Sequence, residues 1–78
     1  MDRRFWVAIK DDEPLRSNWL QGGLQEAAER WTDAAQYIDA TEMSDYEFEY
    51  LVVNKKPLFY CGGVVVMGKV VTLIGAQS

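Results

Sequence analysis

Alternation of apolar and polar residues predicts a β-strand at the start of the chain. In the segment 3–10, every second residue is strongly apolar: Phe5, Val7 and Ile9. This period of two is typical of a strand with one face in the core, which leaves Trp6 on the opposite, partly exposed face. The acidic run and proline that follow end the strand, because aspartate and proline favour turns.

A stripe of apolar residues at helical spacing then predicts one α-helix. The stripe recurs every three or four residues: Leu20, Leu24, Ala27, Trp31, Ala34 or Ala35, and Ile38. Each glycine inside a helix costs about 1 kcal/mol relative to alanine. Because Gly22 and Gly23 stand at the start of the stripe, we expect the regular helix to run from about Gly23 to Ile38.

The rest of the chain predicts a meander of three strands. The segment 46–53, YEFEYLVV, alternates clearly and is expected to be the first strand. After a loop at 54–57, the second strand runs from 58 to 67, with a bulge or bend at Gly62 and Gly63. A turn at Gly68 and Lys69 leads to the last strand, 70–74. The continuous apolar runs of this final hairpin predict that both of its faces are covered.

The elements together predict an α+β fold in one domain, residues 1–78, in the order β-α-β-β-β. One helix packs on a curved, mainly antiparallel sheet of about four strands. The position of the first strand stays open, since it can run parallel or antiparallel to its neighbour.

Composition limits the class of protein. The chain has 78 residues and 49% hydrophobic residues, which suffice for a single core. The single cysteine excludes an internal disulfide framework and fits a reducing cytoplasm. No charged-then-apolar leader opens the chain, and the longest nearly uncharged run, 57–68, is too short for a membrane helix. We therefore expect a cytoplasmic protein.

Charge is strongly polarised along the chain. Between Asp11 and Glu49 lie eleven carboxylates against Arg16 and Arg30, which gives 2 − 11 = −9, whereas the net charge of the whole chain is −4. Both ends are mildly basic. An acidic centre attracts basic surfaces and repels nucleic acid, so direct nucleic-acid binding is disfavoured.

The carboxylates of this centre form two groups that are candidates for partner binding. The first group lies on the polar face of the predicted helix: Glu26, Glu29 and Asp33. The second group lies in and before the strand 46–53: Asp39, Glu42, Asp45, Glu47 and Glu49. On a strand, alternate residues are about 6.7 Å apart, a spacing that loosely matches every second phosphate step of about 3.4 Å along duplex DNA. The alternatives are a solvated helix face and charges that prevent edge-to-edge aggregation of sheets.

Three aromatic residues are candidate anchors for a partner: Trp6, Tyr46 and Tyr50. Tryptophan and tyrosine contribute much of the binding free energy at protein interfaces. The alternative for Trp6 is packing against a loop or a second copy of the chain.

Catalytic and metal chemistry is poorly supported. The chain has no histidine and one cysteine, Cys61, so a transition-metal site and an activated thiol are both disfavoured. No calcium-binding loop or phosphate-binding loop is present. A carboxylate pair acting as acid and base needs a deep cleft, which a chain this short hardly provides. We expect no enzyme activity, no cofactor and no metal.

A small, acidic, aromatic-rich domain without catalytic residues resembles the phage-encoded inhibitors of host proteins, of which the anti-CRISPR proteins are the best known. Several of those are acidic and occupy the basic nucleic-acid channel of a CRISPR effector complex. The resemblance covers size, charge layout and organisation, and it carries over no residue roles. It implies a viral inhibitor in the host cytoplasm that acts by local DNA mimicry.

The leading hypothesis is therefore an interaction protein whose acidic face docks on a basic, nucleic-acid-binding surface of a host complex. The alternative is a small structural or regulatory module that self-associates through apolar sheet surface around Trp6 and the C-terminal hairpin. The sequence leaves open whether the protein is a monomer or a homodimer.

Overall fold

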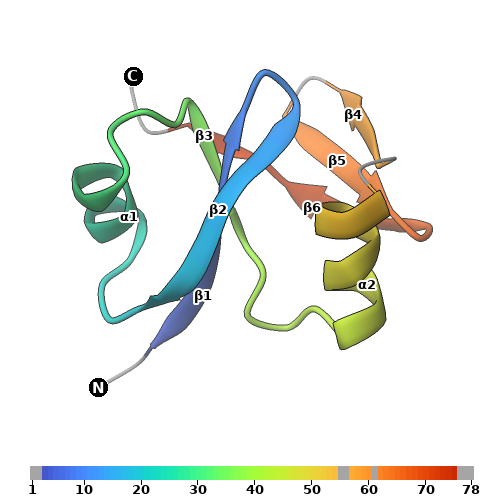
Figure 1. The fold of residues 1–78 in the computed structure, drawn as a ribbon, viewed down its shortest axis with the longest axis horizontal. Helices are drawn as coiled ribbons and strands as arrows, with labels where there is room; N and C mark the ends of the chain where they lie inside the picture. Colours follow the sequence, from blue (N-terminus) through green and yellow to red (C-terminus); the bar gives the residue numbers. More distant parts are fainter. Residues whose placement is uncertain (1–2, 55–56, 61, 76–78) are drawn as a thin grey trace.

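The computed structural model describes residues 3–54, 57–60 and 62–75 and shows an α+β fold with two antiparallel sheets (Figure 1). The four-stranded sheet has the order β2-β1-β3-β7, with β1 Arg4–Lys10, β2 Glu13–Leu20, β3 Gln36–Asp39 and β7 Ile74–Gly75. The three-stranded sheet has the order β4-β5-β6, with β4 Leu58–Tyr60, β5 Gly63–Val66 and β6 Lys69–Thr72. The helices are α1 Leu24–Arg30 and α2 Asp45–Glu49, and α2 continues into the π-helical segment η1 Tyr50–Asn54.

A single residue, Leu73, separates β6 from β7, so one stretch of chain takes part in both sheets. It pairs first with β5 and then with β3. The three-stranded sheet is thereby fixed against one face of the four-stranded sheet, and α2 and η1 lie beside it (Figure 1).

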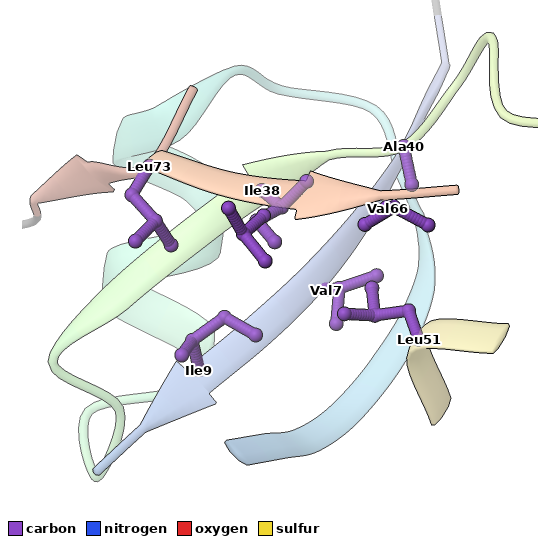
Figure 2. Close-up of a cluster of buried hydrophobic side chains, with 8 residues drawn as sticks. Val7, Ile9, Ile38, Ala40, Leu51, Val66 and Leu73 are labelled. Carbon is purple, nitrogen blue, oxygen red and sulfur yellow. The ribbon is translucent and has the colours of Figure 1, made fainter. Parts of the chain in front are cut away.

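The first strand is the centre of the four-stranded sheet, antiparallel to both β2 and β3. Its alternate side chains belong to two separate cores. Val7 and Ile9 lie between the two sheets, in a cluster completed by Ile38, Ala40, Leu51, Val64, Val66 and Leu73 (Figure 2). The opposite face of β1 packs against α1, in a cluster of Trp6, Ala8, Leu20, Ala27, Trp31 and Tyr37.

The predicted position of Trp6 on an exposed face is wrong. Its side chain is only 4% exposed, because α1 covers the sheet face on which Trp6 lies. The prediction that Val7 and Ile9 face the core is confirmed, and Phe5 packs against the same cluster.

The strand β2 begins in the acidic and proline-containing segment that is predicted as a turn, and it ends at Leu20, where the predicted helical stripe begins. Its hairpin with β1 turns at Asp11 and Asp12, whose φ angles are 54° and 60°. Aspartate tolerates this left-handed conformation better than most residues, and two positive φ angles give the twist that a two-residue hairpin needs.

The long helix predicted up to Ile38 is also wrong, since α1 ends at Arg30. Tyr37 and Ile38 are neighbours in β3, and each is buried in a different core. Only an extended chain directs consecutive side chains to opposite faces, so burial of both residues favours a strand over a helix here. The hydroxyl of Tyr37 donates a hydrogen bond to the carbonyl of Trp31 over 2.7 Å, which ties the loop after α1 to β3, and burial raises the pKa of this hydroxyl.

The segment 46–53, predicted as the clearest strand, is helical. Its apolar residues alternate, but Phe48, Leu51 and Val52 also fit a helical spacing of three and four. Ser44 and Glu47 form a capping box, in which each side chain accepts a hydrogen bond from the other's backbone N–H. This cap satisfies N–H groups at the start of α2 and favours the helix over the strand.

A C-terminal meander is present, but with β4, β5 and β6 as its strands. The bulge or bend predicted at Gly62 and Gly63 within one continuous strand is instead a reversal between two strands, since Tyr60 of β4 pairs with Gly63 of β5. The next turn lies at Met67 and Gly68, with φ angles of 52° and 83°, one residue earlier than predicted. The outer face of this sheet is not covered, because Val70 is 63% exposed. Cys61 and part of the 54–57 loop lie outside the described residues.

Replacement of Leu51 by alanine tests whether η1 closes the core between the sheets. Leu51 is fully buried, and loss of such a leucine typically costs about 2–5 kcal/mol. Val53 lies two residues later and is 66% exposed, so Val53→Ala should change stability by less than about 0.5 kcal/mol. Urea denaturation of both variants measures the difference. Equal effects would contradict the helical placement of this segment.

Candidate protein-binding surface

The two groups of candidate carboxylates do not share one face. The helix α1 covers the face of the four-stranded sheet that carries Trp6 and Ala8, whereas α2 and η1 lie on the face of Val7 and Ile9 (Figure 1). Glu26 and Glu29 therefore lie on the opposite side of the sheet from the carboxylates of α2. A single acidic face made of all eight residues does not form.

Ion pairs neutralise half of the eight carboxylates. The pairs, with nitrogen–oxygen distances, are Arg4–Asp39 at 3.0 Å, Arg16–Asp33 at 2.7 Å, Arg30–Glu26 at 3.4 Å and Lys69–Glu47 at 3.3 Å. The hydrogen bond from Arg16 lowers the pKa of Asp33, so this carboxylate is held charged by its own chain. Paired carboxylates attract a basic partner less strongly, because their charge is already balanced locally.

Of the eight candidate carboxylates, four stay without an ion pair in the described part of the chain: Glu29, Glu42, Asp45 and Glu49. Asp45 and Glu49 are four residues apart in α2, a spacing that places them on the same side of a helix. The predicted row of Asp45, Glu47 and Glu49 does not form, because this segment is a helix. On a helix, Glu47 lies on a different side from Asp45 and Glu49, and it forms an ion pair with Lys69.

Tyr46 lies next to this pair and is 76% exposed. We call Asp45, Tyr46 and Glu49 together the α2 surface. The other two candidate anchors are placed differently. Trp6 is buried, and its indole N–H has no hydrogen-bond partner among the described residues. Tyr50 is half-buried and packs against the core between the sheets.

An aromatic hollow opens between β1, β2 and α2, beside the α2 surface. Its volume is about 170 Å³, and its lining consists of Phe5, Trp19, Ala40, Thr41, Met43, Asp45 and Phe48. The Phe5 ring centre lies 5.3 Å from that of Trp19 and 5.1 Å from that of Phe48. Trp19 is 45% exposed, so part of its indole is open to a partner.

The sequence pattern does not identify Trp19 as a surface residue of a strand, because the predicted helical stripe begins directly after it, at Leu20. Its position follows from β2, where Trp19 pairs with Phe5 across the hairpin. In the segment 15–19 only Leu15 and Trp19 are apolar, and their spacing of four fits a helix as well as a strand. The aspartate-rich turn directly before this segment is the signal that could have indicated a hairpin strand.

Two further features, metal-ligand clusters and membrane-spanning helices, are absent from the described residues. In the ranges 3–54, 57–60 and 62–75, no group of three or more metal-ligating side chains is placed to hold an ion. Across the same ranges, no helix has the length and apolar character required to span a bilayer.

Comparisons of the chain with protein-family models, with curated proteins and with solved structures find no match.

The capping box gives Glu47 a structural role that can be tested by measuring the stability of the fold as a function of pH. The backbone N–H of Ser44 lowers the pKa of Glu47, desolvation opposes this, and Lys69 adds to the lowering. A lowered folded-state pKa means that the ionised side chain stabilises the fold above its ordinary pKa of 4.5, and that this contribution is lost as the pH falls through the lowered value.

We therefore expect Glu47→Gln to be less stable than the wild type at about pH 7 and equally stable at about pH 2. Glutamine keeps the acceptor of the capping box and removes only the charge. Thermal unfolding followed by circular dichroism across this range measures the convergence. The control is Glu29→Gln, which should leave the stability at neutral pH unchanged. A constant gap between wild type and Glu47→Gln at all pH values would contradict the role of the charge.

Proposed function

We propose that the protein is a non-enzymatic interaction module that binds a basic surface of a partner protein through the α2 surface and the aromatic hollow. The partner surface is of the kind that otherwise holds nucleic acid, so binding blocks it. The observation that carries the proposal is the placement of two carboxylates without ion pairs in the described part, Asp45 and Glu49, four residues apart in the helix that also carries the exposed Tyr46.

The two kinds of side chain on this surface have complementary effects. Exposed carboxylates steer a basic partner and set its orientation, whereas they add little affinity each. Aromatic side chains supply the larger part of the affinity at protein interfaces. Tyr46 follows Asp45 in α2, and Trp19 lines the aromatic hollow together with Asp45, so charge and aromatic area lie close together around Asp45. The likeness to nucleic acid is thus local and limited to this region.

Charge reversal tests the proposal against a matched control. Asp45→Lys with Glu49→Lys changes the α2 surface, whereas Glu13→Lys with Glu29→Lys makes the same change of net charge on β2 and α1. The probe is an arginine- and lysine-rich peptide bound to a short labelled DNA duplex. We expect wild-type protein to release the duplex at a constant salt concentration of about 50 mM, because it competes with the duplex for the basic peptide.

The α2 double variant should need at least about tenfold more protein for half-release, because each lost contact is worth up to about 1 kcal/mol and reversal adds repulsion. The control double variant should behave like the wild type. Fluorescence anisotropy of the duplex measures the release. If both double variants lose activity equally, only net charge matters and the α2 surface is not the binding site.

A second candidate function rests on the outer face of the three-stranded sheet. Leu58, Val65 and Val70 are paired across β4, β5 and β6 and form one apolar row. Leu58 is 68% exposed and Val70 is 63% exposed. Contiguous exposed apolar area is typical of interaction sites. The row therefore favours self-association through the C-terminal hairpin, one of the two regions that the sequence suggests for this contact. Trp6 takes no part, because it is buried.

Light scattering across a salt series separates this candidate from acidic docking. Self-association through the apolar row should persist or strengthen as salt rises, because apolar contacts are not screened. Val70→Lys should then shift a dimer to the monomer, whereas Glu29→Lys should leave it unchanged. A wild-type protein that is monomeric at every concentration and salt would exclude self-association.

A further inference from the structure

The size of the aromatic hollow restricts what it can hold. Pockets for drug-sized ligands and cofactors usually have volumes of about 300–1,000 Å³. The hollow measures about 170 Å³. A protein cavity of about 150 Å³ accommodates a benzene molecule. The hollow therefore fits one planar side-chain group and is too small for a cofactor.

The chemistry of the lining selects among side chains. Three aromatic rings, from Phe5, Trp19 and Phe48, form apolar walls, and Asp45 is the only charged residue among the described residues that line the hollow. A carboxylate from a partner would be repelled by Asp45. A purely apolar side chain would leave Asp45 desolvated without a compensating charge, which is unfavourable.

Arginine satisfies both parts of the lining. Its planar guanidinium stacks on aromatic faces and also pairs with carboxylates through its fork of N–H donors. It is also more weakly hydrated than the ammonium of lysine, so its transfer into a partly apolar hollow is easier. The half-exposed indole of Trp19 provides a face for stacking, and Asp45 lines the same space.

We propose that the aromatic hollow receives one arginine side chain of the basic partner, stacked on Trp19 and paired with Asp45. This inference rests on the proposed function, because it names the group on the partner that the α2 surface recognises. It goes beyond charge attraction, since it requires arginine to be preferred over lysine at one position of the partner.

The test uses two lysine-rich peptides that differ at one central position, arginine in one and lysine in the other. Their net charges are equal, so simple electrostatic attraction does not distinguish them. We expect the arginine peptide to bind about two- to fivefold more tightly, which is the range of a single cation–π contact at an exposed site. Titration followed by fluorescence anisotropy of labelled peptide measures the two dissociation constants.

Two variants locate the preference. Trp19→Leu removes the stacking surface and Asp45→Asn removes the charge, and each should bring the two peptides to equal affinity. In the wild type, the NMR signal of the Trp19 indole N–H, assigned by its loss in Trp19→Leu, should shift with the arginine peptide. The signals of the buried Trp6 and Trp31 serve as internal controls. Asp45→Asn alters an exposed side chain, so it gives a result even where Trp19→Leu disturbs the fold.

The outcomes separate this inference from the proposed function. If both peptides bind equally to the wild type and the α2 charge reversal still weakens binding, the arginine site is wrong and the proposed function stands. If neither peptide binds, both are wrong. An arginine preference that survives in Trp19→Leu and Asp45→Asn would place the recognition elsewhere on the molecule.

Discussion

The fold depends on the burial of β1 on both of its faces. Val7 and Ile9 are fully buried between the two sheets, and Trp6 and Ala8 are buried under α1. A strand covered on both sides needs a layer on each face, so a chain of only 78 residues builds two small cores instead of one. The remaining elements follow from this requirement, since α1 supplies one layer and the three-stranded sheet with α2 and η1 supplies the other (Figure 1).

This layered arrangement also decides the distribution of charge. The helices α1 and α2 pack on opposite faces of the four-stranded sheet, so their carboxylates cannot form one surface. Ion pairs from Arg4, Arg16, Arg30 and Lys69 then balance one carboxylate each. What remains near α2 is a small acidic region, Asp45 and Glu49, whose neighbours are aromatic. A protein with modest net charge can thus present a locally acidic surface of defined shape.

The aromatic hollow depends on where a short helix, α2, begins. The capping box of Ser44 and Glu47 fixes where α2 begins, and this start places Asp45 and Phe48 beside the β1–β2 hairpin. Phe5 belongs to β1 and Trp19 to β2, so three elements distant in sequence contribute to one small space. Because Phe5 packs against the core between the two sheets, one wall of the hollow is anchored to that core.

The sequence by itself determined the α+β class, the first strand with Val7 and Ile9 inside, the acid-rich centre and a C-terminal meander. These features depend on local alternation, composition and glycine, which act over a few residues. The tertiary structure alone decided the rest. The segment 46–53 fits both a strand and a helix period, so local pattern does not choose between them. The end of the predicted helix is the strand β3, because Tyr37 and Ile38 are buried in two different cores. Contacts between residues distant in sequence decide which carboxylates stay without ion pairs. They also bring Phe5 next to Trp19. Local patterns carry no information about such contacts.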